Sequence, residues 1–490
     1  MANTLKALET FLEHHRRLSQ LISVLNFDLE TKAPLKSFEE RNKIISFYAS
    51  ERASISENEE FIRLIDALSK EKLNEPLSLF VKDQRNGIEH MAKIGSDRFF
   101  HWNVNIGKST ELWMKAKKEY DFSVVKEALR RVIEDKKEEA NLLRKPDQKT
   151  LYDYFLNEYE KGMNEEKIDA VFGPLKEFLV QNLPTVLKKQ ENWKIPQILP
   201  HPKHEQEHLA LDVLDLIGYD MERGALAETE HPFSDYVARD DHRVTTHYRE
   251  DWRSSLFSVL HEGGHAIQFQ AWGHTHYDNY VDGRASAAMC ETHSRFFENV
   301  IGRSRAFSKA LLNLCKTAFN SEFVAMTEDD FYKSINVVKP SLIRTDADEY
   351  TYCLHIIIRY ELERDLINGK LEVDDLPKAW NQKYHDYLGI AVPADDVGVL
   401  QDIHWYEGLI GYFPSYALGN IYGTQILSAI KRDVDFEGAL ERADLKPILD
   451  WLNRNDFAID YFDPDDWIMK VTGQKMDVSY FKSYLRDKYF

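Results

Sequence analysis

Apolar residues recur three and four positions apart through the first 190 residues of the chain, and Lys and Glu occupy many of the positions between them. This spacing is typical of amphipathic helices, and one example is the series Leu5, Leu8, Phe11 and Leu12. Sustained alternation of apolar and polar residues, which would predict strands, is missing from this part of the sequence. We therefore predict an N-terminal helical lobe over residues 1 to about 195.

Three prolines interrupt the helical pattern between Trp193 and His204. Proline removes a backbone donor and clashes with the preceding turn, so this stretch cannot continue a helix. Helical periodicity then returns, and we predict a second helical region over about 205–490. The pattern favours an all-α fold in which one domain covers 1–490 and the proline-rich stretch connects two lobes.

His261 and His265 lie four residues apart within the apolar segment Leu256 to Gln270. On a helix this spacing places both imidazoles on one face, where they can bind a single metal ion. Glu262, next to the first histidine, can accept a proton from a metal-bound water, which is the chemistry of the H-E-x-x-H motif. The alternative is a buried helix with two hydrogen-bonded core histidines.

Gly263 and Gly264 follow the glutamate of this motif, and each costs a helix about 1 kcal/mol relative to alanine. Close approach of another backbone or of substrate, where a side chain would not fit, explains such a cost. We therefore predict a tight contact at these two positions.

A third metal ligand is needed, because catalytic zinc usually takes three protein ligands and leaves one position for water. The spacing H-E-x-x-H-x-x-G-x-x-H does not supply a third histidine here, since positions 268 and 271 are Gln and Ala. The next segment with helical periodicity, Ala285 to Val300, carries Glu291 and Glu298. Either glutamate could complete the site.

The formal net charge of −19 over 490 residues argues against nucleic-acid binding, which needs a basic surface. The chain has three cysteines, Cys290, Cys315 and Cys353. They are too few for a disulfide framework, and no two of them form a C-x-x-C pair. A reducing, cytoplasmic location fits this composition. We expect Cys290 to be a small buried apolar side chain.

The N-terminus shows neither a basic nor an apolar signal segment, so we expect no secretion. A long uncharged run lies between Glu407 and Lys431, but it contains Pro414, Asn420 and Gln425. We predict that it forms a buried helix and loop near the active site instead of a membrane span. No membrane partner is expected.

Five motifs, in their order along the chain, resemble those of the carboxypeptidase Taq family of metallocarboxypeptidases. They are His231-Pro232-Phe233, Asp241-x-Arg243-x-Thr245, His261-Glu262-x-x-His265, Ile343-Arg344-x-x-Ala347-Asp348 and Gly398-x-x-Gln401-Asp402-x-His404-Trp405. Similar segments near both ends extend the resemblance over essentially the whole chain. Together the motifs are far more specific than any one of them.

One motif departs from the family pattern. Where the family usually has His-Glu-Ser-Gln, this chain reads Cys290, Glu291, Thr292 and His293. The retained glutamate favours Glu291 over Glu298 as the third metal ligand. The changed neighbours can alter metal affinity or preference, because residues behind the ligands orient them.

The resemblance, combined with the chemistry of the side chains, assigns the metal site. His261, His265 and Glu291 would hold one divalent ion per subunit, and we expect zinc, with cobalt or manganese as alternatives that the same donors accept. Glu262 would accept the proton of the attacking water and pass it to the leaving amine.

The resemblance also points to residues from other motifs. His404 and Tyr416, with Tyr412 as the alternative tyrosine, would stabilise the oxyanion that develops on the scissile carbonyl. His231 would contact the substrate, and Asp402 would orient site residues from behind.

A carboxypeptidase must recognise a free carboxylate, and an arginine fork does this with paired charge-assisted hydrogen bonds. We predict that Arg344 is this fork, held by the carboxylates that follow it, Asp346, Asp348 and Glu349. Arg243 is the second choice. For either arginine the alternative is a buried structural ion pair.

The resemblance implies a metal-dependent carboxypeptidase that releases single amino acids from peptides with a free C-terminal carboxylate, with broad specificity and poor action on proline. A metal-dependent oligopeptidase or dipeptidyl carboxypeptidase is the alternative, and a helical peptide-binding protein without catalysis is a third reading. Two helical lobes around a long substrate groove and a homodimer are also implied. A short edge strand or hairpin near Thr245 to Arg249 could pair with substrate backbone.

Overall fold

The computed structural model describes residues 2–275, 286–319, 322–459 and 463–490. Its first part forms helices joined by short turns, as predicted. Polar caps set where several of them begin, for example Asn58 before α3 and the capping box of Thr150 and Asp153 on α7. The helices are α1 (Ala2–Thr31), α2 (Phe38–Glu57), α3 (Glu59–Leu68), α4 (Glu75–Ile94), α5 (Ser96–Glu119), α6 (Lys126–Leu143), α7 (Leu151–Tyr159) and α8 (Glu165–Gln190).

After α8 the chain forms no helix until Lys203, so the break predicted at the prolines is confirmed. The predominantly helical fold is confirmed as well. The buried helix and loop expected between Glu407 and Lys431 are α16 and the turns before it. The helices of this part are α9 (Lys203–Ile217), α10 (Trp252–Thr275), α11 (Ala287–Arg295), α12 (Arg305–Phe319), α13 (Glu328–Ile335), α14 (Glu349–Ile367), α15 (Leu376–Leu388), α16 (Phe413–Asp433), α17 (Phe436–Glu441), α18 (Lys446–Leu452), α19 (Pro464–Thr472) and α20 (Ser479–Tyr489).

Three short strands form one sheet in the order β1 (Gly224–Glu228), β3 (Asp241–Thr246) and β2 (Ser234–Ala238). β3 pairs parallel with β1 and antiparallel with β2. Of the edge strand or hairpin predicted near Thr245 to Arg249, the edge strand is wrong, because β3 ends at Thr246 and lies in the centre of the sheet, whereas β2 and β3 do form an antiparallel hairpin. The neighbour that covers the second edge of β3 is β1, whose five half-buried residues lack the alternation that reveals a strand.

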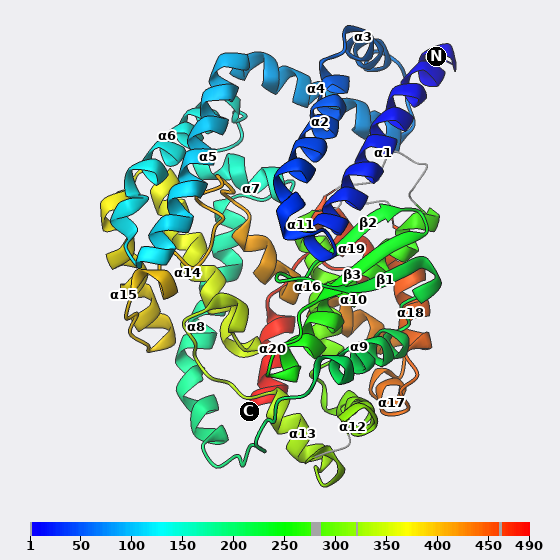
Figure 1. Ribbon diagram of the computed structural model, residues 1–490, viewed down its shortest axis with the longest axis vertical. Coiled ribbons are helices and arrows are strands. Elements are labelled where there is room, and N and C mark those ends of the chain that lie inside the picture. The colour runs from blue at the N-terminus through cyan, green and yellow to red at the C-terminus, as the bar shows by residue number, and fades with distance from the viewer. Residues whose placement is uncertain (1, 276–285, 320–321, 460–462) are drawn as a thin grey trace.

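Helices from distant parts of the sequence are interleaved in space. Figure 1 shows α5, α6, α8, α14 and α15 on one side of the molecule and α9, α12, α17 and α18 on the other, with α16 and α20 between them. α14 and α15 belong to the second half of the chain, yet α14 packs against α6 and α8, and α15 packs against α8. Helices from before and after the proline-rich stretch therefore pack together.

One continuous hydrophobic core extends from Ile94 to Tyr489, and α1–α4 share a smaller core of their own. α14 lies in the large core with nearly all of its residues buried, including Arg359 and Glu363. Buried charges are costly unless they are paired, so α14 must have partners for these two side chains.

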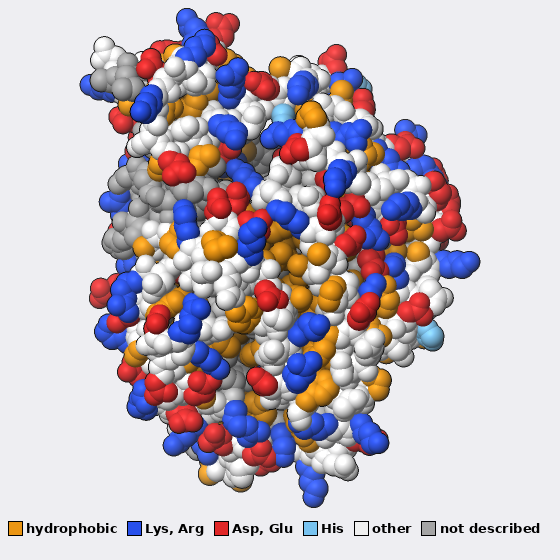
Figure 2. Space-filling model, turned by 180° about the vertical axis from the view of Figure 1, so that it is seen from behind, with side chains coloured by type: hydrophobic (Ala, Val, Ile, Leu, Met, Phe, Trp, Pro, Cys, Tyr) orange, Lys and Arg blue, Asp and Glu red, His pale blue; other side chains and the backbone are white. Residues whose placement is uncertain are grey.

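Basic and acidic side chains are interspersed over the face seen in Figure 2, and hydrophobic side chains gather toward its centre. Among the helices that the structure describes, none combines the length and the apolar character needed to span a bilayer.

Candidate metal centre and substrate-binding residues

The two glycines of the histidine motif lie where helices meet. A Cβ at Gly264 would be 2.7 Å from the His293 carbonyl oxygen and 3.0 Å from Ser294 Cα, both in the backbone of α11. A Cβ at Gly263 would be 2.7 Å from Ile217 Cδ1, at the end of α9. The predicted tight contact is confirmed, and it brings α10 close enough to α11 for their side chains to share one site.

His261 and His265 of α10 converge with Glu291 of α11. The Oε2 atom of Glu291 is 3.8 Å from His261 Nε2 and 3.7 Å from His265 Nε2. The candidate ligand atoms of all three residues lie within 4.8 Å of one another. Two imidazole nitrogens and one carboxylate oxygen match the donor set of a catalytic zinc-type site with an open position. The residues therefore fit the divalent ion that the sequence predicts.

Glu298 lies beside this cluster in the π-helical turn η4 (Phe296–Ile301), which continues α11. Its Oε2 atom accepts a hydrogen bond of 3.0 Å from His261 Nδ1, which directs Nε2 of that ring toward Glu291. Although burial raises the pKa of Glu298, Arg295 and the bond to His261 lower it to about 2, so the carboxylate stays ionised. Geometrically, Glu291 and not Glu298 completes the set of ligand atoms.

Arg295 joins the two glutamates. Its Nε atom donates to Glu291 Oε1 at 2.6 Å, and its Nη1 atom donates to Glu298 Oε2 at 3.0 Å. Since Arg295 occupies Oε1 of Glu291, the other oxygen is left to face the two histidines.

Glu262 is buried next to the cluster. Burial raises the pKa of its carboxyl group to about 7, against the opposing effects of His261 and of a hydrogen bond with Ser234 in β2. A carboxyl group that titrates near neutrality can both accept and release a proton. The environment of Glu262 thus suits proton transfer beside a metal.

Two of the changed neighbours of Glu291, Cys290 and His293, have separate environments. His293 is buried, and its Nε2 atom is 2.8 Å from Asp456 Oδ2, while Trp467 donates to the other Asp456 oxygen at 2.9 Å. Its side chain is thus engaged in a buried pair and is not one of the converging ligands. Burial raises the pKa of Cys290 to about 12, so this side chain is a neutral thiol.

His404, Tyr412 and Tyr416 form an aromatic cluster at the start of α16. The ring centroids of Tyr412 lie 5.9 Å from His404 and 5.2 Å from Tyr416. Burial lowers the pKa of His404 to about 4 and raises the pKa of both tyrosines, so the imidazole is neutral and the hydroxyls are protonated. The helix that follows this cluster packs directly on a predicted metal ligand, since a Cβ at Gly419 of α16 would be 2.8 Å from Glu291 Cγ.

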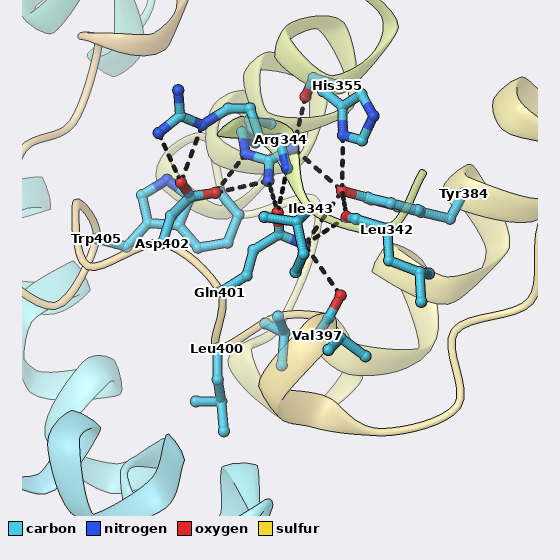
Figure 3. A network of polar contacts seen from close by, with 12 residues as sticks. Leu342, Ile343, Arg344, His355, Tyr384, Val397, Leu400, Gln401, Asp402 and Trp405 are labelled. Carbon is cyan, nitrogen blue, oxygen red and sulfur yellow. Dashed lines mark hydrogen bonds and ion pairs between the residues drawn. The ribbon is translucent and has the colours of Figure 1, made fainter. Parts of the chain in front are cut away.

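Arg344 forms a fork with Asp402, and the two side chains point toward each other in Figure 3. Its Nε and Nη2 atoms are each 2.9 Å from Asp402 Oδ1. Its Nη1 atom is 3.5 Å from the hydroxyl of Tyr352, whose ring lies 4.1 Å below the guanidinium of Arg295. Tyr352 therefore connects Arg344 to the metal centre.

The carboxylate partners predicted for Arg344 are wrong. Asp348 caps the N-terminus of α14, Glu349 binds residues of α20, and Asp346 is exposed. Asp402 takes their place although it lies 58 positions away in sequence. Helix capping explains the difference, because the carboxylate before a helix is drawn to its free backbone N–H groups.

Arg243 and His231 lie on or beside the sheet. Arg243 pairs with Asp241 at 2.8 Å and lies 4.9 Å from the ring centroid of Phe27 in α1. Adjacent residues of a strand point to opposite faces, and Val244 is buried in the core on the α10 side, so Arg243 faces α1. His231 is exposed in the connection between β1 and β2. Neither residue contributes to the three converging ligand atoms of the metal cluster.

Sequence reasoning missed the roles of Arg295 and Glu298 in supporting the metal cluster. They follow Glu291 by four and seven positions, which is the spacing of one helical face, so this signal was available.

The roles of two buried glutamates, Glu363 and Glu160, were also missed, and the sequence offers no signal for them. Glu363 accepts hydrogen bonds from Tyr152 at 2.6 Å, Trp405 at 2.7 Å and the backbone of Gly411 at 2.6 Å, which fixes the loop that carries His404. Their partners come from distant helices and loops, so no local pattern reveals them.

Glu160 links the starts of two helices of the site. It accepts hydrogen bonds of 2.7 Å from the Ala288 backbone in α11 and from Ser415 in α16. Burial raises the pKa of its carboxyl group to about 7.

Taken together, a helical fold, a His-Glu-x-x-His helix and a third carboxylate ligand on the next helix define a metallopeptidase of the helical type. The model of the carboxypeptidase Taq (M32) metallopeptidases matches residues 7–489 of the chain. The chain belongs to this family and is a metallocarboxypeptidase, which confirms the resemblance read from its motifs.

Relatives and solved structures agree over the full length. The chain is 35% identical to carboxypeptidase 1 of Bacillus subtilis, covering 96% of this chain and 95% of that protein. It superposes on the crystal structure of the M32 carboxypeptidase of Deinococcus radiodurans with a TM-score of 0.92 at 31% identity, covering 98% of both chains. For metallocarboxypeptidase 1 of Trypanosoma cruzi the TM-score is 0.94 at 28% identity, covering 100% of both.

Proposed function

We propose that this metallocarboxypeptidase removes single amino acids from the C-termini of peptides, with broad side-chain tolerance and poor action on proline. The observation that carries the proposal is one arrangement of side chains. Glu262 is buried beside three converging ligand atoms, and Arg344 is connected to them through Tyr352 and Arg295. The residues proposed for hydrolysis and the arginine proposed to bind the substrate's carboxylate therefore belong to one connected group of side chains.

His261, His265 and Glu291 would hold the metal. We propose zinc, and the same nitrogen and oxygen donors accept cobalt or manganese. When bound, such an ion makes water more acidic and polarises a carbonyl group. Glu298 contributes by holding His261 with its Nε2 atom toward the other ligands.

The chain's own residues carry the proton transfers. Glu262 accepts the proton of the attacking water and delivers it to the leaving amine, a task for which a pKa near 7 is suited. Neutral His404 and the protonated hydroxyl of Tyr416, with Tyr412 as the alternative, donate hydrogen bonds to the oxyanion.

Arg344 anchors the free carboxylate of the substrate through a charge-assisted bond from Nη1, because its Nε and Nη2 atoms are held by Asp402. Asp402 orients this fork, and Asp348 supports it less directly by capping α14. Arg243 and His231 remain predicted substrate contacts, without support from the geometry of the metal cluster.

We also propose a cytoplasmic homodimer. Its three cysteines are free, which fits a reducing compartment. The dimer rests on the family resemblance alone.

The decisive experiment is mass spectrometry of a free-acid peptide and its C-terminally amidated twin after incubation with the enzyme. Each peptide is tested with chelator, with added zinc and with the Glu262→Gln variant. We expect a ladder of single-residue losses from the free acid only, stopping before proline and abolished by chelator and by the substitution. Internal cuts in both peptides would instead establish an oligopeptidase, and dipeptide losses a dipeptidyl carboxypeptidase. Absence of cutting with every metal would leave a peptide-binding protein.

A further inference from the structure

Arg359 lies directly behind the proposed carboxylate anchor. Its side chain is 0% exposed and packs 4.7 Å from the ring centroid of Trp380, so it cannot touch a substrate. Its Nε atom donates to Asp402 Oδ2 at 2.6 Å, Nη2 to Gln401 Oε1 at 2.7 Å, and Nη1 to the His355 carbonyl oxygen at 2.8 Å. All three nitrogens of the guanidinium are therefore engaged within the protein.

Asp402 lies between two guanidinium groups. Its Oδ1 atom binds Arg344 and its Oδ2 atom binds Arg359, so one negative charge is shared by two positive ones. Burial raises the pKa of Asp402, but the two arginines together outweigh this effect and lower it, so the carboxylate is ionised. The trio therefore carries one net positive charge. Without Arg359, the pair of Arg344 and Asp402 would be neutral.

The remaining donor of Arg344 is placed to use that charge. Its Nη1 atom has only a long contact of 3.5 Å with the Tyr352 hydroxyl, whereas Nε and Nη2 bind Asp402. A carboxylate that approaches Nη1 meets a group whose positive charge is not fully neutralised.

Gln401 couples Arg359 to the backbone of the anchor as well. Its Oε1 atom accepts from the Arg344 backbone N–H at 3.0 Å and from Arg359 Nη2 at 2.7 Å. Its amide nitrogen donates to the carbonyl oxygens of Leu342 and Val397 at 3.0 Å each, as Figure 3 shows. Arg359 thus supports Arg344 through both its carboxylate partner and its main chain.

We propose that Arg359 is a positioning residue for recognition of the substrate's C-terminal carboxylate. By holding Asp402 and Gln401 it keeps Arg344 in place and leaves one net positive charge for the substrate. The inference rests on the proposed role of Arg344 as the anchor.

The test measures peptide binding by calorimetry in zinc-loaded protein with the Glu262→Gln background, which prevents turnover. The probes are an N-blocked alanine peptide with a free C-terminal carboxylate and its amidated twin. The variants are Arg359→Met, Arg359→Lys, Arg344→Met and the pair Arg359→Met with Asp402→Asn. Arg364→Met is the matched control, because Arg364 is on the same helix and pairs with Asp169.

We expect Arg359→Met to weaken binding of the free acid about tenfold to a hundredfold and to change binding of the amide less than about threefold. Arg359→Lys keeps the charge and should lose less. The added Asp402→Asn substitution restores one net positive charge and should recover most of the affinity. If Arg359 had a purely structural role, its loss would weaken binding of both peptides. The double variant would then bind the free acid no better than Arg359→Met does.

If Arg344→Met weakens binding of the free acid, two results would overturn the proposal. One is unchanged binding of the free acid by Arg359→Met, and the other is no recovery of binding in the double variant. If Arg344→Met has no effect, the anchor of the proposed function is wrong instead. If Arg359→Met fails to fold, the double variant and Arg359→Lys still test the proposal. The double variant removes the buried carboxylate that would lack a partner, and Arg359→Lys keeps a cation beside that carboxylate.

Discussion

The metal cluster and the arginine network are two groups of buried charge on neighbouring helices. The polar atoms of the network are hydrogen-bonded to one another, whereas those of the cluster are not. Around Arg359 each guanidinium nitrogen has a partner within 2.6 to 2.8 Å. In the cluster, Glu291 Oε2 and the two histidine Nε2 atoms converge at 3.7 and 3.8 Å, too far apart for hydrogen bonds. Buried atoms that face one another without bonding indicate where a ligand is held, whereas saturated atoms keep the site in shape.

The largest expected effect is at the metal cluster. Glu262→Gln should reduce kcat by about a thousandfold while metal content and KM change little, because only proton transfer is lost. Released amino acids measured by chromatography and bound metal measured by mass spectrometry test this. Glu230→Gln, at an exposed position between β1 and β2, is the control. Retention of a tenth of the activity would remove Glu262 from the mechanism.

The next effect separates a ligand from the residue that orients it. Glu298→Gln should weaken zinc binding about tenfold to a hundredfold, because His261 loses the charged partner of its Nδ1 atom. Competition with a chelator of known affinity gives the dissociation constant, and exposed Glu441→Gln provides the reference. An unaltered constant would show that the orientation of His261 does not depend on this bond.

The backbone contact beneath the cluster should affect stability. Gly264→Ala is expected to destabilise the protein by about 1–3 kcal/mol, because the new Cβ would meet α11 at 2.7 Å. Gly107→Ala has no atom within 4 Å of the new Cβ, and should be neutral or slightly stabilising. Thermal melting compares the two, and equal shifts would contradict the close packing of α10 on α11.

The last prediction concerns the pH dependence of stability. The folded-state pKa of Glu160 is about 7, raised from 4.5 by burial, so its stabilising contribution is complete below pH 4.5 and is lost as pH rises through 7. Glutamine resembles the protonated form, so the stability advantage of Glu160→Gln over the parent should grow by about 2–3 kcal/mol between pH 5 and pH 8, because each unit of the pKa difference corresponds to about 1.4 kcal/mol. Melting curves at both pH values test this. Glu166→Gln should show no such gain, since the pKa of Glu166 is lowered by Lys149.

The sequence predicted the features that depend on local periodicity and on motifs. The helices, the break at the prolines, the contact at the two glycines and the convergence of His261 with His265 and Glu291 all follow from spacing along one chain segment or from family motifs. The partner of Arg344 did not, because Asp402 lies 58 positions away and Asp348 is used as a helix cap. β1 was hidden for a related reason, since its pairing with β3 and not its own pattern makes it a strand.

The burial of α14 has a consequence for the motions of the enzyme. This one helix begins at the cap Asp348, carries Arg359 and Glu363, and is surrounded by the core over nearly all of its length. Segments of this kind exchange their amide hydrogens only when the whole domain opens, whereas helices with a small core of their own can open separately. Hydrogen exchange should therefore be slowest in α14 and faster in α1–α4, so that the charges behind the active site stay fixed while the N-terminal helices are free to fluctuate.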